Sequence, residues 1–140
     1  MYEQDHNKVM STPASAQLIS NQLYYKRFFP YYISNILAGL DENGEGVIYS
    51  YDPVGHCERN KYRTGGSSSA LIQPLLDNQI GLKNQENAEP RELTVDEAKK
   101  VIKDVFISAA ERDIYCGDAV VIQTITKDGI QEEKFDLRKD

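Results

Sequence analysis

The sequence predicts an α+β fold in which antiparallel sheets pack against helices. One observation is a run of apolar residues at helical spacing between positions 98 and 110, behind a helix-capping motif. Another is a β-branched stretch, Ala119–Thr126, followed by a tight turn and a second strand-like segment. The order of elements is the third: a helix, three strands, two helices and two strands. Short turns join most neighbouring strands, which favours antiparallel sheets covered by helices.

The first helix is expected to begin at Ser11 or Thr12, after a polar segment, 1–11, that shows no clear period. Either hydroxyl can accept a hydrogen bond from a free N–H group of the first turn, and Pro13 suits that turn. Pro30 is expected to stop the helix, because it cannot donate a hydrogen bond and disfavours helical geometry just before it. The apolar face combines Ala16, Ile19, Leu23 and the stem of Lys26.

Three strands are expected next. The segment 32–40 is apolar and aromatic on both sides, which is typical of a strand covered on both faces. Residues 41–46 form a turn rich in Asn and Gly, and 47–51 is the second strand of a hairpin. A further turn at 52–55 leads to a polar third strand at 56–63.

Two helices follow the sheet. Ser67, after Gly65 and Gly66, is a plausible N-cap, and its helix carries Pro74 near its first turns. The apolar residues of that helix are Ala70, Leu71, Leu75 and Leu76.

After a charged loop, Thr94 and Glu97 have the spacing of a capping box, in which each side chain satisfies a free N–H group. The helix behind it places seven residues on one face: Ala98, Val101, Ile102, Val105, Phe106, Ala109 and Ala110. Strands at 119–126 and 130–137, joined by a turn at 127–129, end the chain.

Composition restricts the class of protein. The chain has 140 residues, enough for one domain, and 22 acidic against 16 basic residues. This balance argues against a nucleic-acid binder, which needs clustered Lys and Arg. The sequence contains no apolar run of membrane-spanning length and does not start like a signal peptide. Cys57 and Cys116 are too few for a disulfide framework, so we expect free thiols in a soluble intracellular domain.

Several strings of residues together resemble the beta subunits of the 20S proteasome core particle, and among them a non-catalytic class. The strings are Arg27–Tyr32, Gly39–Asp41, Tyr51–Gly55, Gly65–Ala70 with Leu75–Gln79, Val105–Asp113 and Leu137–Asp140. The resemblance runs along the whole chain. It implies the N-terminal nucleophile hydrolase fold, a four-layer α-β-β-α sandwich of antiparallel sheets.

The resemblance also implies that residues 1–140 are the C-terminal portion of that domain, without its first strands and first helix. Those strands would carry the catalytic N-terminal threonine of active relatives. A sandwich without them would leave about 500 Å² of apolar surface wet, at a cost on the order of 10 kcal/mol. We therefore expect the 140 residues alone to be aggregated or molten.

In function, the resemblance implies a structural beta subunit that contributes to ring assembly and to the proteolytic chamber for ATP- and ubiquitin-dependent degradation. Its partners would be the other alpha and beta subunits, with protein substrates passing through the chamber and no nucleic acid or membrane involved. The implied localisation is cytoplasm and nucleus. Two alternatives stay open: an active threonine-type endopeptidase whose nucleophile lies in the preceding segment, and an unrelated small interaction domain.

No catalytic residue is expected in this chain. Three positions match the network that supports the threonine in active relatives: Ser67, Asp113 and Cys116. The aspartate would orient the amine of the nucleophile, and Cys116 stands where active subunits carry a serine. Without the resemblance, Ser67 simply caps its helix, and Asp113 pairs with Arg112 or accepts backbone N–H groups at a turn.

No cofactor is required, although the resemblance allows a structural divalent cation such as magnesium on the backbone carbonyls of Ala110, Asp113 and Cys116. The spacings of His6, His56 and the cysteines fit no zinc pattern. A cluster of aromatic residues has two open interpretations, core packing beneath a helix or a contact surface for neighbouring subunits. Its members are Tyr24, Tyr25, Phe28, Phe29, Tyr31 and Tyr32.

Overall fold

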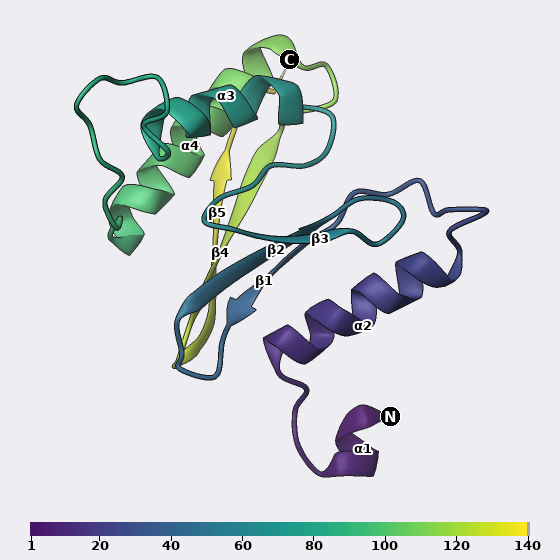
Figure 1. The fold of residues 1–140 in the computed structure, drawn as a ribbon. Helices are drawn as coiled ribbons and strands as arrows, with labels where there is room; N and C mark the ends of the chain where they lie inside the picture. Colours follow the sequence, from purple (N-terminus) through teal and green to yellow (C-terminus); the bar gives the residue numbers. More distant parts are fainter. Residues whose placement is uncertain (140) are drawn as a thin grey trace. The chain divides into compact units, whose positions relative to one another are not determined.

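The computed structural model describes residues 1–139, so Asp140, the last residue of the C-terminal string, lies outside the described residues. The chain forms two compact units (Figure 1). The first comprises residues 1–63 and 125–128, and the second comprises residues 64–124 and those from Gly129 onward. Both units combine helices with antiparallel strands, which confirms the predicted α+β class. Within residues 1–139 no helix is both long and apolar enough to cross a bilayer.

Two helices open the first unit. The short helix α1 (Tyr2–His6), within the segment for which no period was found, ends at Asn7 in the left-handed conformation (φ 52°). Helix α2 (Thr12–Tyr25) begins as predicted, and Ser11 is the cap because its hydroxyl accepts a hydrogen bond from Ala14 N at 3.3 Å. It ends before Pro30 is reached. Residues 26–29 continue as tight turns, in which Arg27 N donates to Tyr24 O and Phe29 N to Lys26 O.

A three-stranded antiparallel sheet follows, in the order β1 (Ile36–Leu40), β2 (Gly46–Tyr51) and β3 (Cys57–Asn60). The prediction of a doubly covered strand at 32–40 was wrong. Residues 32–35 are irregular, after a turn in which Ile33 N donates to Tyr31 O, and no residue of β1 is fully buried. Strand β3 covers only half of the predicted 56–63. Local apolarity therefore overestimated the length and the cover of β1, and the predicted polar strand at 56–63 was too long as well.

Helix α2 packs against this sheet through the face that its sequence predicted. The buried cluster of Ala16, Leu23 and Tyr51 is flanked by Ile19, Leu37, Tyr49 and Cys57. The Tyr51 hydroxyl donates to Ala16 O at 2.7 Å, and Ser20 Oγ donates to Gly55 O at 2.6 Å. Side-chain hydrogen bonds thus join α2 to β2 and to the loop at Gly55, in addition to the apolar contact between α2 and the sheet.

Helix α3 (Ser69–Gln79) opens the second unit, one position later than a Ser67 cap requires. The prediction of Ser67 as N-cap was wrong, because Ser68 occupies the cap position and its hydroxyl is turned to another partner. Pro74 lies inside the helix. The buried face consists of Ile72 and Leu76, whereas Ala70, Leu71 and Leu75, which were expected on the apolar face, are exposed.

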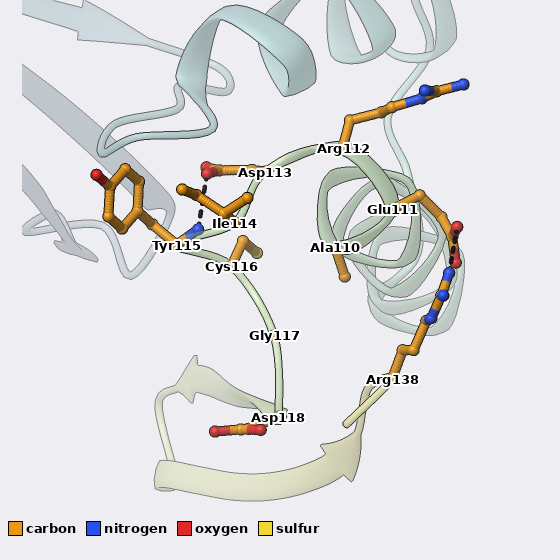
Figure 2. A pocket seen from close by; sticks show the side chains of 10 residues that line it. All are labelled: Ala110, Glu111, Arg112, Asp113, Ile114, Tyr115, Cys116, Gly117, Asp118 and Arg138. Atoms are coloured by element: carbon orange, nitrogen blue, oxygen red, sulfur yellow. Dashed lines mark hydrogen bonds and ion pairs between the residues drawn. The ribbon is translucent and has the colours of Figure 1, made fainter. Parts of the chain in front are cut away.

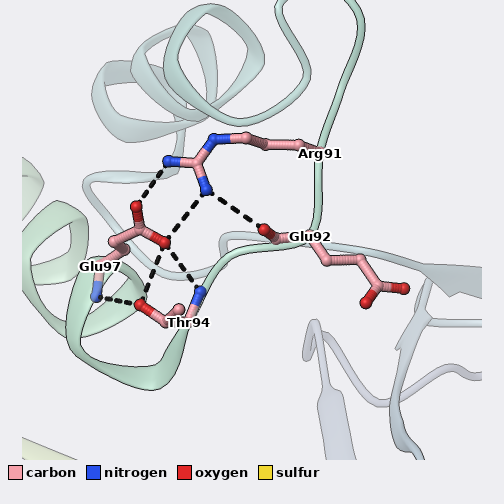
Figure 3. A network of polar contacts seen from close by, with 4 residues as sticks. All are labelled: Arg91, Glu92, Thr94 and Glu97. Carbon is pink, nitrogen blue, oxygen red and sulfur yellow. Dashed lines mark hydrogen bonds and ion pairs between the residues drawn. The ribbon is translucent and has the colours of Figure 1, made fainter.

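Helix α4 (Val95–Arg112) has the predicted capping box, with Thr94 Oγ1 accepting from Glu97 N at 3.3 Å and Glu97 Oε2 accepting from Thr94 N at 2.9 Å. Figure 3 shows that Arg91 adds a cation to this cap, with 2.5 Å between its Nη2 and Glu97 Oε1. These hydrogen bonds lower the pKa of Glu97 to about 2, those from Arg91 contributing most.

The hairpin of β4 (Ala119–Thr126) and β5 (Gly129–Asp136) packs against α4 near its predicted position. Val120, Ile122 and Leu137 form the buried cluster, and the neighbours that pack on it are Ile102, Phe106, Ala110 and Phe135. The helical periodicity at 98–110 therefore identified the correct face of α4.

Candidate functional site

The carboxylate of Asp113 joins two helix ends of the second unit. Asp113 is the first residue after α4, and Ser67 and Ser68 directly precede α3. Ser67 Oγ donates to Asp113 Oδ2 at 2.7 Å, and Ser68 Oγ donates to the same oxygen. The other oxygen, Oδ1, accepts a hydrogen bond from Tyr115 N at 2.9 Å (Figure 2).

These hydrogen bonds favour the ionised carboxylate. They hold the pKa of Asp113 below its ordinary value, with the Ser68 hydroxyl as the largest cause, followed by Ser67 and by Tyr115 N. Ser68 is buried, whereas Ser67 is exposed. At neutral pH the carboxylate is therefore a negative acceptor that already has three donors.

The structure thus brings together two of the three network positions expected from the sequence, Ser67 and Asp113. Without the resemblance, Asp113 was expected to pair with Arg112 or to accept backbone N–H groups at a turn. The second expectation is confirmed by the hydrogen bond from Tyr115 N. Figure 2 shows the Arg112 side chain directed away from this carboxylate. Ser68 was missed. The signal in the sequence was a glycine, Gly66, before three consecutive serines. Gly66 adopts a left-handed conformation (φ 87°), and the hydroxyls of the next two serines both reach the Asp113 carboxylate.

Cys116 follows in the same turn, where its N–H donates to Asp113 O at 3.1 Å. Its side chain is half-buried, and the thiol is free. Thiols donate and accept hydrogen bonds only weakly, so Cys116 is a poor substitute for a hydroxyl.

A hollow of about 390 Å³ lies beside this turn (Figure 2). Ala110, Asp113 and Cys116, which were expected to offer carbonyl oxygens to a cation, all line it. Arg138 Nη1 and Glu111 Oε2 form an ion pair 2.8 Å apart at its wall. Within residues 1–139 no group of three His, Cys, Asp or Glu side chains is placed to hold a metal ion.

Comparison with known proteins identifies relatives along the entire chain. A family model described as "Proteasome subunit" matches residues 1–125. The chain is 57% identical over 140 residues to "Proteasome subunit beta type-1-B" of Carassius auratus, a match that covers 100% of this chain and 59% of the relative. It is 57% identical over 141 residues to "Proteasome subunit beta type-1" of Drosophila melanogaster, covering 99% of this chain and 60% of the relative.

A more distant relative is "Proteasome subunit beta type-6" of Saccharomyces cerevisiae, 46% identical over 148 residues, with coverage of 99% of this chain and 61% of the relative. The chain therefore spans about three-fifths of the length of the curated relatives it matches.

Proposed function

Because the chain belongs to the proteasome subunit family, we propose that it acts as a non-catalytic, structural beta subunit of the 20S proteasome core. In this role it takes part in ring assembly with other alpha and beta subunits. It contributes to the chamber in which ATP- and ubiquitin-dependent protein degradation takes place. The observation that carries the proposal is the match of nearly the whole chain, at 57% identity, to proteins named beta type-1 subunits.

The absence of catalysis is supported by the surroundings of Asp113. In active relatives the matching aspartate is expected to orient the amine of the threonine nucleophile. Here Ser68 and Tyr115 N also donate to that carboxylate, in addition to the Ser67 hydroxyl that an active site would share. Cys116 supplies a thiol where active relatives carry a hydroxyl. Together these features favour a structural function for the carboxylate.

The competing function is an active threonine-type endopeptidase with its nucleophile outside these 140 residues. The 2.7 Å contact between Ser67 and Asp113 favours it, because an active site would need the same pair. The thiol of Cys116 argues against it. Covalent labelling of a nucleophilic threonine separates the two functions.

We also propose that the hollow beside Asp113 can take a divalent cation on the carbonyl oxygens of Ala110, Asp113 and Cys116. The donor type fits, because Mg²⁺ and Ca²⁺ prefer oxygen ligands. The Asp113 carbonyl already accepts the Cys116 N–H but retains a second lone pair. Any such ion would have a structural function, holding the turn after α4.

For localisation we propose cytoplasm and nucleus, which fractionation of cells with a tagged chain would check.

Assembly is tested by sedimentation. An epitope-tagged chain is expressed in cells, and the lysate is separated on a density gradient. Subunits of known proteasomes mark the particle fractions, and an unrelated tagged protein of similar mass is the control. We expect the tagged chain in the particle fractions together with alpha and beta subunits. A chain found only at the top of the gradient, with the control, would refute the proposed function.

A further inference from the structure

An exposed apolar surface of the first unit lies at the end of α2 and in the segment that joins it to β1. Six aromatic residues within positions 24–32, here called the aromatic loop, face solvent to a large extent. The exposed fractions are 56% for Tyr24, 87% for Tyr25, 94% for Phe28, 79% for Phe29, 48% for Tyr31 and 91% for Tyr32. Of the two interpretations left open by the sequence, core packing within the described unit is therefore wrong.

The loop has a defined conformation without an apolar cover. Tight turns hold its backbone, with Arg27 N on Tyr24 O at 3.0 Å and Phe29 N on Lys26 O at 3.0 Å. Two cations lie among the rings. Arg27 lies over Tyr24 and Phe28, with 5.6 and 5.5 Å to the ring centroids. Lys26 lies over Phe29 and Tyr31 at 5.6 and 4.4 Å. The surface is therefore organised before any partner binds.

The area is sufficient for a protein interface. At about 150–250 Å² for each aromatic residue, the exposed fractions amount to on the order of 700–1,100 Å². This sum is of the same order as the roughly 800 Å² that each partner buries in a standard interface. Tyr, Phe and Arg are also the residue types enriched in the centre of such interfaces.

The charge of the loop indicates the chemistry of its partner. The chain as a whole has a net charge of −6, yet no Asp or Glu occurs between Asp5 and Asp41. Within residues 1–139, neither Lys26 nor Arg27 forms an ion pair with a carboxylate. In the described part of the chain both cations lie over ring faces, and Arg27 also donates to the Tyr24 hydroxyl at 3.1 Å. They remain able to bind carboxylates from another chain.

We propose that the aromatic loop is an assembly surface that binds an acidic segment of a neighbouring subunit, with carboxylates on Lys26 and Arg27 and apolar side chains among the rings. This inference rests on the proposed function, because the neighbouring subunit is the occupant that a ring particle supplies. Buried carboxylate–cation pairs fix the register of two partners, and the rings supply the apolar area.

Photo-crosslinking identifies the occupant. The photoreactive amino acid p-benzoylphenylalanine replaces Phe28 in the tagged chain, and in a control it replaces Val9, which is 76% exposed in the same unit. After irradiation of the particle fractions, mass spectrometry identifies the adduct. We expect the Phe28 position, and not the Val9 position, to react with an Asp- or Glu-containing peptide of another subunit.

Charge reversal tests the chemistry. Lys26→Glu with Arg27→Glu is expected to lower the yield of the Phe28 adduct about tenfold, as loss of interfacial charge pairs does. Lys8→Glu with Lys61→Glu makes the same change in net charge at two other exposed positions of the unit, and we expect less than about a twofold effect. Reversal of the identified carboxylate to Lys in the partner should restore the adduct in the variant that carries both Lys26→Glu and Arg27→Glu.

The outcomes separate the two proposals. An unsubstituted tagged chain missing from the particle fractions refutes the proposed function. A chain present in the particle refutes the inference alone if Phe28 yields no adduct, or an adduct within this chain, with a second copy of it, or with a peptide that lacks acidic residues. Equal effects of the two double charge reversals also refute it.

Discussion

Ser67 Oγ and Asp113 Oδ2 lie 2.7 Å apart although 46 positions separate the two residues in the sequence. With the parallel hydrogen bond from Ser68, this contact ties the beginning of α3 to the end of α4. An exposed Ser–Asp pair is normally weak. Here the buried Ser68 and the N–H of Tyr115 hold the same carboxylate, so the three donors act together.

Ser68→Ala should raise the pKa of Asp113 toward its ordinary value more than Ser67→Ala does, because Ser68 is the largest cause of the lowered pKa. The hydrogen bonds to the ionised form stabilise the link above the ordinary aspartate pKa, about 3.9. That stabilisation is lost as the pH falls through the lowered pKa of the folded chain.

The measurement is hydrogen exchange of the start of α3 and of residues 113–116 in the purified particle, corrected for the intrinsic pH dependence of exchange. As the pH is lowered, exchange of these amides should accelerate. The acceleration should begin at a higher pH in Ser68→Ala than in Ser67→Ala or in the unsubstituted chain. The same pH dependence in all three chains would contradict the assignment.

Thr94→Ala should destabilise the first turn of α4 by about 1 kcal/mol, because the hydroxyl that accepts from Glu97 N is lost.

Glu97→Gln removes the charged partner of Arg91 at the same turn. The contribution of this ion pair to the stability of the turn is complete above pH about 4.3 and is lost as the pH falls through the Glu97 pKa of about 2, so the substitution should abolish it. Exchange of the amides at 95–98 measures both effects. Ser108→Ala, on the same helix, is the matched control and should leave these amides unchanged.

Gly55→Ala should be strongly destabilising, by about 2 kcal/mol or more. Gly55 has φ 89°, and a Cβ there would lie 2.5 Å from Ser20 O and 3.3 Å from Leu23 Cβ on α2. Gly66→Ala is the control, because Gly66 also has a positive φ (87°) but open space around it. Resistance to limited proteolysis should fall far more for Gly55→Ala. Equal losses would show that backbone strain alone matters.

Tyr51→Phe should cost about 0.5–1.5 kcal/mol, because the buried hydroxyl that donates to Ala16 O is removed without changing the ring. Burial raises the pKa of Tyr51, so its phenol stays protonated and the hydrogen bond is fully present below pH about 10. Faster exchange of the β2 amides is the readout. Tyr49→Phe, in the same strand and outside the buried set, should have a smaller effect.

Local signals predicted α4 and the hairpin of β4 and β5 well. The Thr94–Glu97 box and the apolar spacing behind it depend only on neighbouring residues, and the turn at 127–129 fixes its own hairpin. Non-local contacts decided the remainder. Ser67 has the composition of a cap, but a carboxylate from a distant helix end attracts its hydroxyl and that of Ser68.

The sheet of the first unit shows the same limit. Apolar residues at 32–35 favour a strand, yet a strand also needs a hydrogen-bonded neighbour. The β1–β2 ladder starts at Ile36, and before it, among the described residues, only Asn35 O accepts a hydrogen bond from β2, from Tyr51 N. The aromatic residues at 24–32 could not be assigned to core or surface from their type, since both environments favour large apolar rings. Helix α1 was missed because its five residues are too few to show a period.

We propose that this family member occupies the particle without cutting peptides. The most direct test treats the affinity-purified, tagged particle with a covalent probe that reacts with nucleophilic N-terminal threonines, and then identifies the labelled subunits by mass spectrometry. We expect label on other beta subunits of the particle and none on the subunit that carries this sequence. Stoichiometric label on the N-terminal threonine of that subunit would contradict the account.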